Sequence, residues 1–207
     1  MKIDPLALLC LAVLCTILTL GLWPFHSPRN EVSWLAHANG LRFGTYGTVF
    51  GSRPFFAISA PEGLEVTVEI WLQPRRTWDS GTFLTFHLPG RSSEFSLRQS
   101  QTDLLVKAGR REDESHSKAA YFYVRGAFRR GGPAFITVTS DGQALRVYLN
   151  GVLALPRTPL RISANVLTGR LILGDSTGQP DSWSGEMFGL AIYRGPQVSG
   201  KVHCRRR

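Results

Sequence analysis

Hydrophobic and polar residues alternate along several short stretches in the second half of the chain. In residues 145–149, two leucines and a valine alternate with Arg146 and Tyr148, and residues 134–138 repeat the pattern. A period of two residues is typical of a β-strand that buries one face. The alternation therefore predicts strands in this region.

Two tight turns separate these predicted strands. Asp141-Gly142 follows the first strand, and Asn150-Gly151 follows the second. The turns of two-residue hairpins need positive φ angles, which Asn, Asp and Gly adopt most easily. We therefore expect consecutive hairpins and an antiparallel sheet.

The N-terminal region has a different pattern. No residue from Leu6 to Trp23 is charged, and this run approaches the ~20 residues that cross about 30 Å of hydrocarbon. We expect residues 1–25 to form one uncleaved transmembrane helix. A cleaved signal peptide is the alternative, although the nearest small-x-small triplet, at residues 36–38, lies well beyond the apolar run.

Length and composition fit one folded domain after this helix. The chain has 207 residues, of which 43% are hydrophobic, with 12 Phe, 5 Trp and 5 Tyr, and so much apolar surface can offset the entropy of ordering. The remaining ~180 residues suit one β-sandwich. We expect a linker at 26–40, the sandwich at 41–195 and a basic tail at 196–207.

The formal net charge is +9. Arginine pairs at 75–76, 110–111 and 129–130 are scattered among predicted loops, and this scatter favours general attraction to anionic lipid headgroups or envelope polymers. Nucleic-acid binding would need basic residues interleaved with exposed aromatic residues on one sheet. We expect no nucleic-acid partner.

The three cysteines lie outside the predicted sandwich. Cys10 and Cys15 fall in the apolar run and Cys204 in the tail. No pair has the spacing of a zinc site, and no disulfide is expected within the sandwich. An exported domain without disulfides favours a bacterial cell envelope.

Four segments carry a resemblance to a known family: VEIWLQP at 68–74, VYLNG at 147–151, GRLILG at 169–174, and WSGE at 183–186 leading to LAIY at 190–193. Together they resemble the laminin-G-like domain of the concanavalin A-like lectin and glucanase superfamily. The resemblance implies an all-β, two-sheet antiparallel jelly-roll sandwich. It covers the region from 41 to 195 and reflects strands and turns more than reactive groups.

The resemblance also implies a location and partners. Domains of this family are usually exported, so we expect the sandwich outside the cytoplasm, held at the cell membrane by residues 1–25. The segment LWPF at 22–25 ahead of such a domain is similar to bacterial membrane proteins that continue into a VanZ-like membrane domain. Here a VanZ-like partner would be a separate chain or would be absent.

Aromatic and acidic residues on the polar side of the predicted strands suggest a ligand site. Trp71 and Glu69 share one face of their strand, where the indole could stack on a sugar ring. Tyr148 points away from the core of its own strand, and Trp183 lies in a predicted rim loop. We expect these four residues to bind carbohydrate or an envelope polymer without catalysis.

The alternative functions are glycoside hydrolysis and a purely structural role as an accessory domain of a VanZ-like membrane protein. Glucanases of the same superfamily carry Glu-x-Asp-x-Glu on one strand, and here Glu65 and Glu69 have the matching spacing. Thr67 replaces the central carboxylate, which makes separate acid and nucleophile roles harder to establish. We therefore assign no catalytic residue.

A calcium site is a further possibility. Asp175 and Asp181 flank a Gly- and Ser-containing loop after a strand, where domains of this family often hold calcium. Calcium needs six to eight oxygen ligands, so Asn165 and backbone carbonyls would have to converge with the two aspartates. Asp is also a common turn residue, and we expect no obligatory cofactor.

Overall fold

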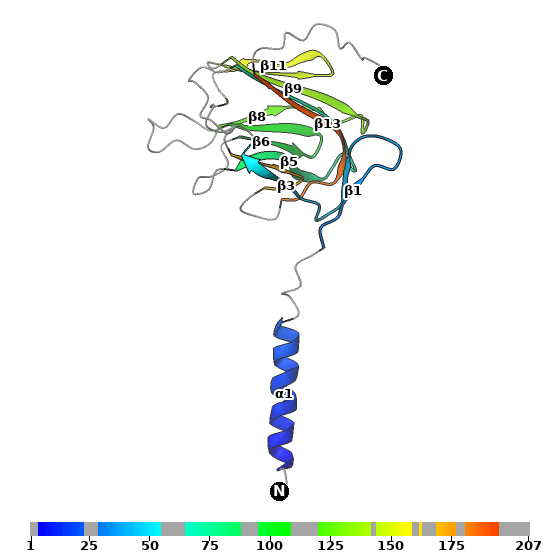
Figure 1. Cartoon of the computed structure of the whole chain (residues 1–207), viewed down its shortest axis with the longest axis vertical. Helices are drawn as coiled ribbons and strands as arrows, with labels where there is room; N and C mark the ends of the chain where they lie inside the picture. Colours follow the sequence, from blue (N-terminus) through cyan, green and yellow to red (C-terminus); the bar gives the residue numbers. More distant parts are fainter. Residues whose placement is uncertain are drawn as a thin grey trace, which may run out of the picture.

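A computed structural model describes residues 4–22, 29–54, 65–87, 95–108, 120–141, 144–158, 162, 169–176 and 181–194. One helix precedes two β-sheets that lie face to face (Figure 1). The elements are α1 (Pro5–Leu22), β1 (Val32–Trp34), β2 (Leu41–Phe43), β3 (Val49–Pro54), β4 (Val66–Pro74), β5 (Ser80–His87), β6 (Phe95–Ser100), β7 (Asp103–Ala108), β8 (Ala120–Val124), β9 (Ala134–Ser140), β10 (Leu145–Leu149), β11 (Val152–Thr158), β12 (Arg170–Leu173) and β13 (Gly185–Arg194).

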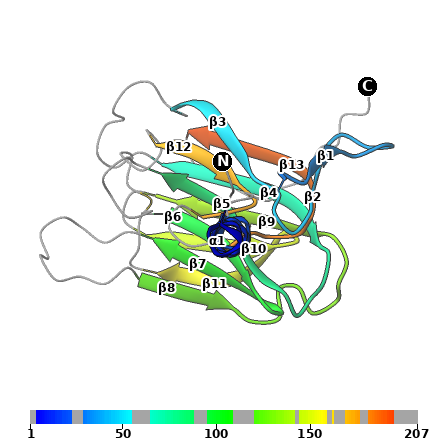
Figure 2. The same ribbon diagram turned by 90° about the horizontal axis from the view of Figure 1, so that it is seen from below.

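The seven-stranded sheet has the order β1-β2-β13-β4-β9-β10-β11, and the six-stranded sheet has the order β3-β12-β5-β6-β7-β8. The second order can be followed from top to bottom in Figure 2. Neighbouring named strands pair in antiparallel fashion in both sheets. The predicted all-β, two-sheet antiparallel sandwich is confirmed.

Strand β4 shows how the sequence positions the core. Its even-numbered residues Val66, Val68, Ile70 and Leu72 are at most 1% exposed, because alternate side chains of a strand point to the same face. Burial of each such side chain stabilises the fold by about 1.5–3 kcal/mol. The odd-numbered residues lie on the opposite face of the sheet.

The predicted hairpin at Asn150-Gly151 is confirmed. Asn150 has φ 51° and Gly151 has φ 80°, and β10 and β11 pair directly across this turn. The Asn150 side chain also accepts a hydrogen bond of 2.9 Å from the backbone N–H of Phe135. The turn is therefore tied to β9 as well as to its own two strands.

The seven-stranded sheet begins earlier in the chain than expected. Strand β1 lies inside the region 26–40 that we predicted as a linker, and Val32 pairs with Phe43 of β2. Three residues are too few for a clear alternation, so the sequence pattern did not reveal this strand.

Helix α1 is apolar around its whole surface. The side chains of Leu6, Ile17 and Leu20 are all more than 60% exposed, and Figure 1 shows α1 clear of both sheets. No helix in the described part of the chain has the length and hydropathy needed to span a membrane, so the structure does not support the transmembrane helix predicted within residues 1–25.

Candidate functional site

The outer face of the seven-stranded sheet brings together three of the four predicted ligand residues. Glu69 of β4 lies opposite Thr137 of β9, which lies opposite Tyr148 of β10. Residues directly opposite one another in a sheet share a face, and Trp71, two residues beyond Glu69, shares it as well. We call Trp71, Phe188, Glu69, Tyr193 and Tyr148 the aromatic face.

Trp71 is the most accessible part of this face. Its side chain is 49% exposed, and its ring centroid lies 5.0 Å from that of Phe188. Gly189 lies opposite Trp71 on β13, and a Cβ built on this glycine would have no atom within 4 Å. The indole therefore borders open space, where a ligand ring can approach it.

Glu69 is held in place by a neighbouring phenol. Tyr193 of β13 donates a hydrogen bond to the Glu69 carboxylate. Burial, together with the negative charge and the hydrogen bond of Glu69, raises the pKa of Tyr193 above its ordinary value of 10.0. At neutral pH the phenol is therefore protonated and donates its hydrogen to the Glu69 carboxylate.

Trp183 does not belong to this face, and the prediction that it lies exposed in a rim loop is wrong. Its side chain is 1% exposed, and its ring centroid lies 5.8 Å from those of Phe43 and Phe83. The segment before β13 forms a parallel bridge between Ser182 and Thr82, near the start of β5. Trp183 contributes to the core because this segment crosses the end of the sandwich.

The indole nitrogen of Trp183 has a partner inside the core. It donates a hydrogen bond of 2.9 Å to the side-chain oxygen of Gln99, which is fully buried. The Gln99 amide group donates in turn to the backbone carbonyls of Arg76, at 2.8 Å, and Gln101, at 3.1 Å. These bonds fix the turn that follows β4.

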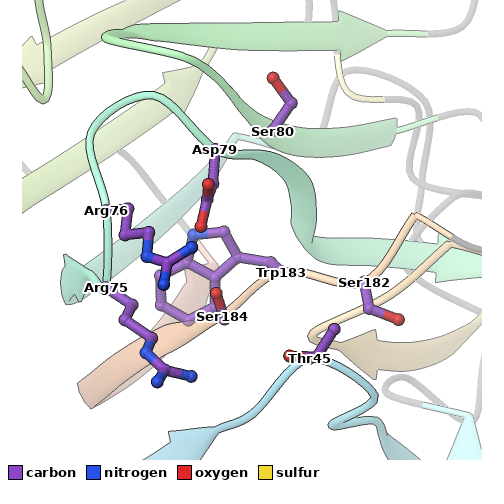
Figure 3. Close-up of a pocket in the computed structure, with 8 residues that line it drawn as sticks. All are labelled: Thr45, Arg75, Arg76, Asp79, Ser80, Ser182, Trp183 and Ser184. Carbon is purple, nitrogen blue, oxygen red and sulfur yellow. The ribbon is translucent and has the colours of Figure 1, made fainter.

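A pocket of about 480 Å³ opens beside this turn (Figure 3). Three separate segments meet there: the stretch after β2, the turn between β4 and β5, and the segment before β13. Its lining consists of Thr45, Arg75, Arg76, Asp79, Ser80, Ser182, Trp183 and Ser184. We call this the arginine pocket.

A second pocket of about 480 Å³ adjoins the arginine pocket, and Arg75 lines both. Its lining also includes Arg42 of β2 and Glu186 of β13, which form an ion pair at 2.7 Å. Gln73, which shares the outer face of β4 with Trp71, lines this second pocket. The second pocket therefore links the aromatic face to the arginine pocket.

The sequence revealed only part of the arginine pocket. From the sequence, the Arg75-Arg76 pair is only one of several basic pairs scattered among predicted loops. Thr45, Ser80 and Ser182 were not singled out, because hydroxyl residues in turns are common and their meeting depends on the fold. The one available signal was a pair of arginines directly after a strand that ends in Pro74.

The predicted calcium ligands lie close together but are engaged by protein groups. The backbone N–H of Asp181 donates to the Asp175 carboxylate at 3.1 Å. The Asp181 carboxylate accepts a hydrogen bond of 2.5 Å from Thr82 and pairs with Arg98. In the described segments no three metal-ligating side chains gather, and Asn165 lies outside them, so calcium binding stays a prediction.

Glu65 and Glu69, the two candidates of the alternative glycosidase hypothesis, differ in their position relative to β4. Glu69 lies inside β4 and is bonded to Tyr193, whereas Glu65 comes just before the strand. Thr67 between them is fully buried. The strand therefore provides no third carboxylate between the two glutamates.

A comparison with protein families matches residues 54–200 to the concanavalin A-like lectin/glucanases superfamily, in its laminin-G form. The chain belongs to this family. Among curated protein sequences, none matches the chain.

Solved structures with a similar fold include receptor-binding domains of botulinum neurotoxins. The serotype D binding domain has a TM-score of 0.56 at 12% identity, with 83% of this chain and 43% of that chain covered. A structure of type C, whose cell entry is described as dependent upon interaction with two ganglioside molecules, has a TM-score of 0.58 at 15% identity, covering 84% and 44%. A third, the DC binding domain in complex with rat synaptotagmin II, has a TM-score of 0.54 at 14% identity, covering 80% and 42%.

This chain therefore spans less than half the length of those neurotoxin chains. At such low identity the likeness concerns the fold alone. It shows that the two-sheet sandwich is shared with part of those neurotoxin chains.

Proposed function

We propose that this protein is a non-enzymatic carbohydrate-binding module that uses its aromatic face. The observation that carries the proposal is the half-exposed indole of Trp71, which borders open space beside Gly189. The apolar C–H face of a sugar ring can stack on such an indole. The Glu69 carboxylate and the oxygen of the Tyr193 hydroxyl, which donates its own hydrogen to Glu69, provide acceptors for sugar hydroxyls.

Family and fold support a binding role. The family includes lectins, and the similar neurotoxin structures are described as binding domains. Another similar structure is the serotype D ligand binding domain in complex with N-acetylneuraminic acid. Because sugar-binding sites can lie in the half of those chains that this protein does not match, the proposal rests on the aromatic face itself.

The test is a binding screen of the full chain, in detergent micelles, against a glycan array and peptidoglycan fragments. The best ligand is then titrated against Trp71→Ala, with Trp34→Ala as the matched control. Trp34 is an exposed tryptophan on the edge strand β1, outside the aromatic face. We expect Trp71→Ala to weaken binding at least about tenfold, equal to about 1.4 kcal/mol, and Trp34→Ala to leave it unchanged.

Two results would reject the aromatic face as the binding surface. One is no glycan binding above background by the wild-type chain. The other is equal affinity of the Trp71→Ala variant and the wild-type protein for the best ligand.

Glycoside hydrolysis through Glu65 and Glu69 is the second candidate, because the family also includes glucanases. Hydrolysis of β-glucans by the wild-type chain, lost in both Glu65→Gln and Glu69→Gln, would replace the binding proposal. An inert wild-type protein would leave binding as the function.

Membrane attachment through residues 1–25 is part of the proposal. The apolar surface of α1 is exposed on all sides, and apolar area left in water is unfavourable by about 25 cal/mol per Å². The bilayer of a bacterial cell membrane would cover this surface, with the sandwich on the extracytoplasmic side. A VanZ-like membrane protein is the partner that the sequence resemblance suggests for the same segment.

A further inference from the structure

We infer that the arginine pocket binds the carboxylate of an acidic sugar, at a site separate from the indole of Trp71. Arg75 and Arg76 both line the pocket and are exposed. Within the described part of the chain, neither guanidinium group has an ion-pair partner. Two free guanidinium groups at one opening favour an anion, and the planar fork of Arg matches a carboxylate with two parallel hydrogen bonds.

The rest of the lining suits a polyhydroxylated ligand. Thr45, Ser80, Ser182 and Ser184 contribute hydroxyl groups, and Asp79 contributes the single carboxylate. Each hydroxyl can donate one hydrogen bond and accept two, whereas Asp79 only accepts. This combination fits sugar hydroxyls around one negative charge better than it fits an inorganic anion, which offers acceptors but no donors to Asp79.

The pocket has the size of a small-ligand site. Its volume of about 480 Å³ falls within the roughly 300–1,000 Å³ of typical ligand pockets. Trp183, whose side chain is 1% exposed, lies at the base of this lining. A monosaccharide can be enclosed there with its carboxylate toward the two arginines.

The walls of the pocket are held by buried contacts. Gln99 binds the backbone carbonyl of Arg76 and the indole of Trp183, which belong to different walls. The backbone N–H of Arg75 also donates to the carbonyl of Ser184 at 3.0 Å and joins the same two walls. A site that is already ordered loses less conformational entropy on binding.

The neighbouring surface extends the site toward longer ligands. Arg75 lines both pockets, and Gln73 connects the second pocket to the outer face that carries Trp71. Trp71 and Gln73 are two residues apart on β4, and such a step along a strand is about 7 Å. This distance is comparable to the spacing of successive sugar rings. An acidic oligosaccharide can therefore occupy the arginine pocket with one unit and extend toward Trp71.

The experiment compares glucuronic acid with glucose, which differ only by the carboxylate at C6. The full chain is titrated with each sugar, and with inorganic sulfate, by calorimetry at pH 7. We expect at least about tenfold tighter binding of glucuronic acid, and sulfate should not displace it at equal concentration. Equal affinity for the two sugars would overturn the inference, and full displacement by sulfate would indicate an adventitious ion only.

Two double variants, each of which removes two positive charges, test whether the acidic sugar binds in the arginine pocket. The double variant Arg75→Ala/Arg76→Ala should lose the preference for glucuronic acid. The control Arg53→Ala/Arg170→Ala removes two exposed arginines near the other end of the sandwich, since Arg170 lies opposite His87 of β5, and should keep it. Loss of the preference in both double variants would show a general charge effect and overturn the site.

A lysine variant separates bidentate recognition from charge alone. Arg75→Lys/Arg76→Lys preserves both charges but not the fork, so we expect binding weakened at least about threefold, and unchanged binding would contradict the proposed geometry. Trp71→Ala distinguishes this inference from the proposed function. Glucuronic acid binding should survive that substitution, whereas binding of a neutral glycan to the aromatic face should not.

Discussion

The indole N–H of Trp183 lies 2.9 Å from the side-chain oxygen of Gln99, and both side chains are buried. Gln99 belongs to β6 of the six-stranded sheet, whereas Trp183 directly precedes β13 of the seven-stranded sheet. This hydrogen bond thus connects a strand of one sheet to the segment that leads into the other. The same glutamine positions the backbone of Arg76 at the arginine pocket.

Trp183→Phe should destabilise the fold. The substitution keeps an aromatic ring but leaves the Gln99 oxygen buried without its donor, which costs about 1–3 kcal/mol. The free energy of unfolding, measured by urea denaturation of the full chain, provides the test. Trp34→Phe at an exposed position should change it by less than about 0.5 kcal/mol, and equal effects of the two variants would contradict the buried hydrogen bond.

Gly81→Ala should be destabilising because the chain passes very close to this glycine. A Cβ at this position would lie 2.5 Å from the carbonyl oxygen of Ser182 and 2.7 Å from the Cα of Trp183. We expect a loss of about 1–3 kcal/mol in unfolding free energy. Gly132→Ala is the control, since its Cβ would meet nothing within 4 Å, and thermal melts of the two variants should differ clearly.

Tyr193 should make stability depend on alkaline pH. Its pKa is raised in the folded protein above the ordinary 10.0, chiefly by burial and then by Glu69. The neutral phenol therefore contributes stability that is fully present below pH 10.0 and is lost as pH rises through the folded pKa. Urea denaturation at several alkaline pH values should show this fall in the wild type and a smaller fall in Tyr193→Phe.

Spectroscopy can separate the two causes of this shift. In Glu69→Gln the negative charge disappears while the burial of Tyr193 remains. Absorbance at 295 nm should then report a lower pKa for Tyr193 than in the wild type, although still a raised one. An unchanged titration curve would contradict the contact between Tyr193 and Glu69.

Membrane attachment predicts a clear fractionation pattern. The wild-type chain expressed in bacteria should sediment with membranes and resist extraction with alkaline carbonate. Leu11→Arg/Leu14→Arg places two charges in the middle of α1, where each costs about 2.5–3.5 kcal/mol on membrane insertion, and should release the protein. A wild-type chain found entirely in the soluble fraction would refute the attachment.

The sandwich could be predicted because its signals are local. Alternation in residues 145–149 and the Asn150-Gly151 turn depend on neighbouring residues alone, and the structure confirms both. The placement of Glu69 and Tyr148 on the outer face followed from the same two-residue period. A local pattern is sufficient to predict a strand and the face of each side chain wherever one face of the strand is buried and the other is exposed.

The candidate sites depended on longer-range information. Trp183 was expected in an exposed loop because its neighbours are small and polar, but the bridge from Ser182 to Thr82 directs the indole inward. The arginine pocket combines Thr45, Arg75 and Ser182 from separate segments. Only the packing of the two sheets brings these segments together. The spacing of residues along the chain does not indicate that they meet.

Strand β13 is the last strand of the described chain, yet it lies between β2 and β4 in the seven-stranded sheet. During synthesis, β2 and β4 therefore leave the ribosome long before the strand that separates them. Until Arg194 has emerged, both keep an unpaired edge that can pair with other chains. A nascent chain stalled before β13 should consequently aggregate or require a chaperone, and the sandwich should form only after β13 has been synthesised.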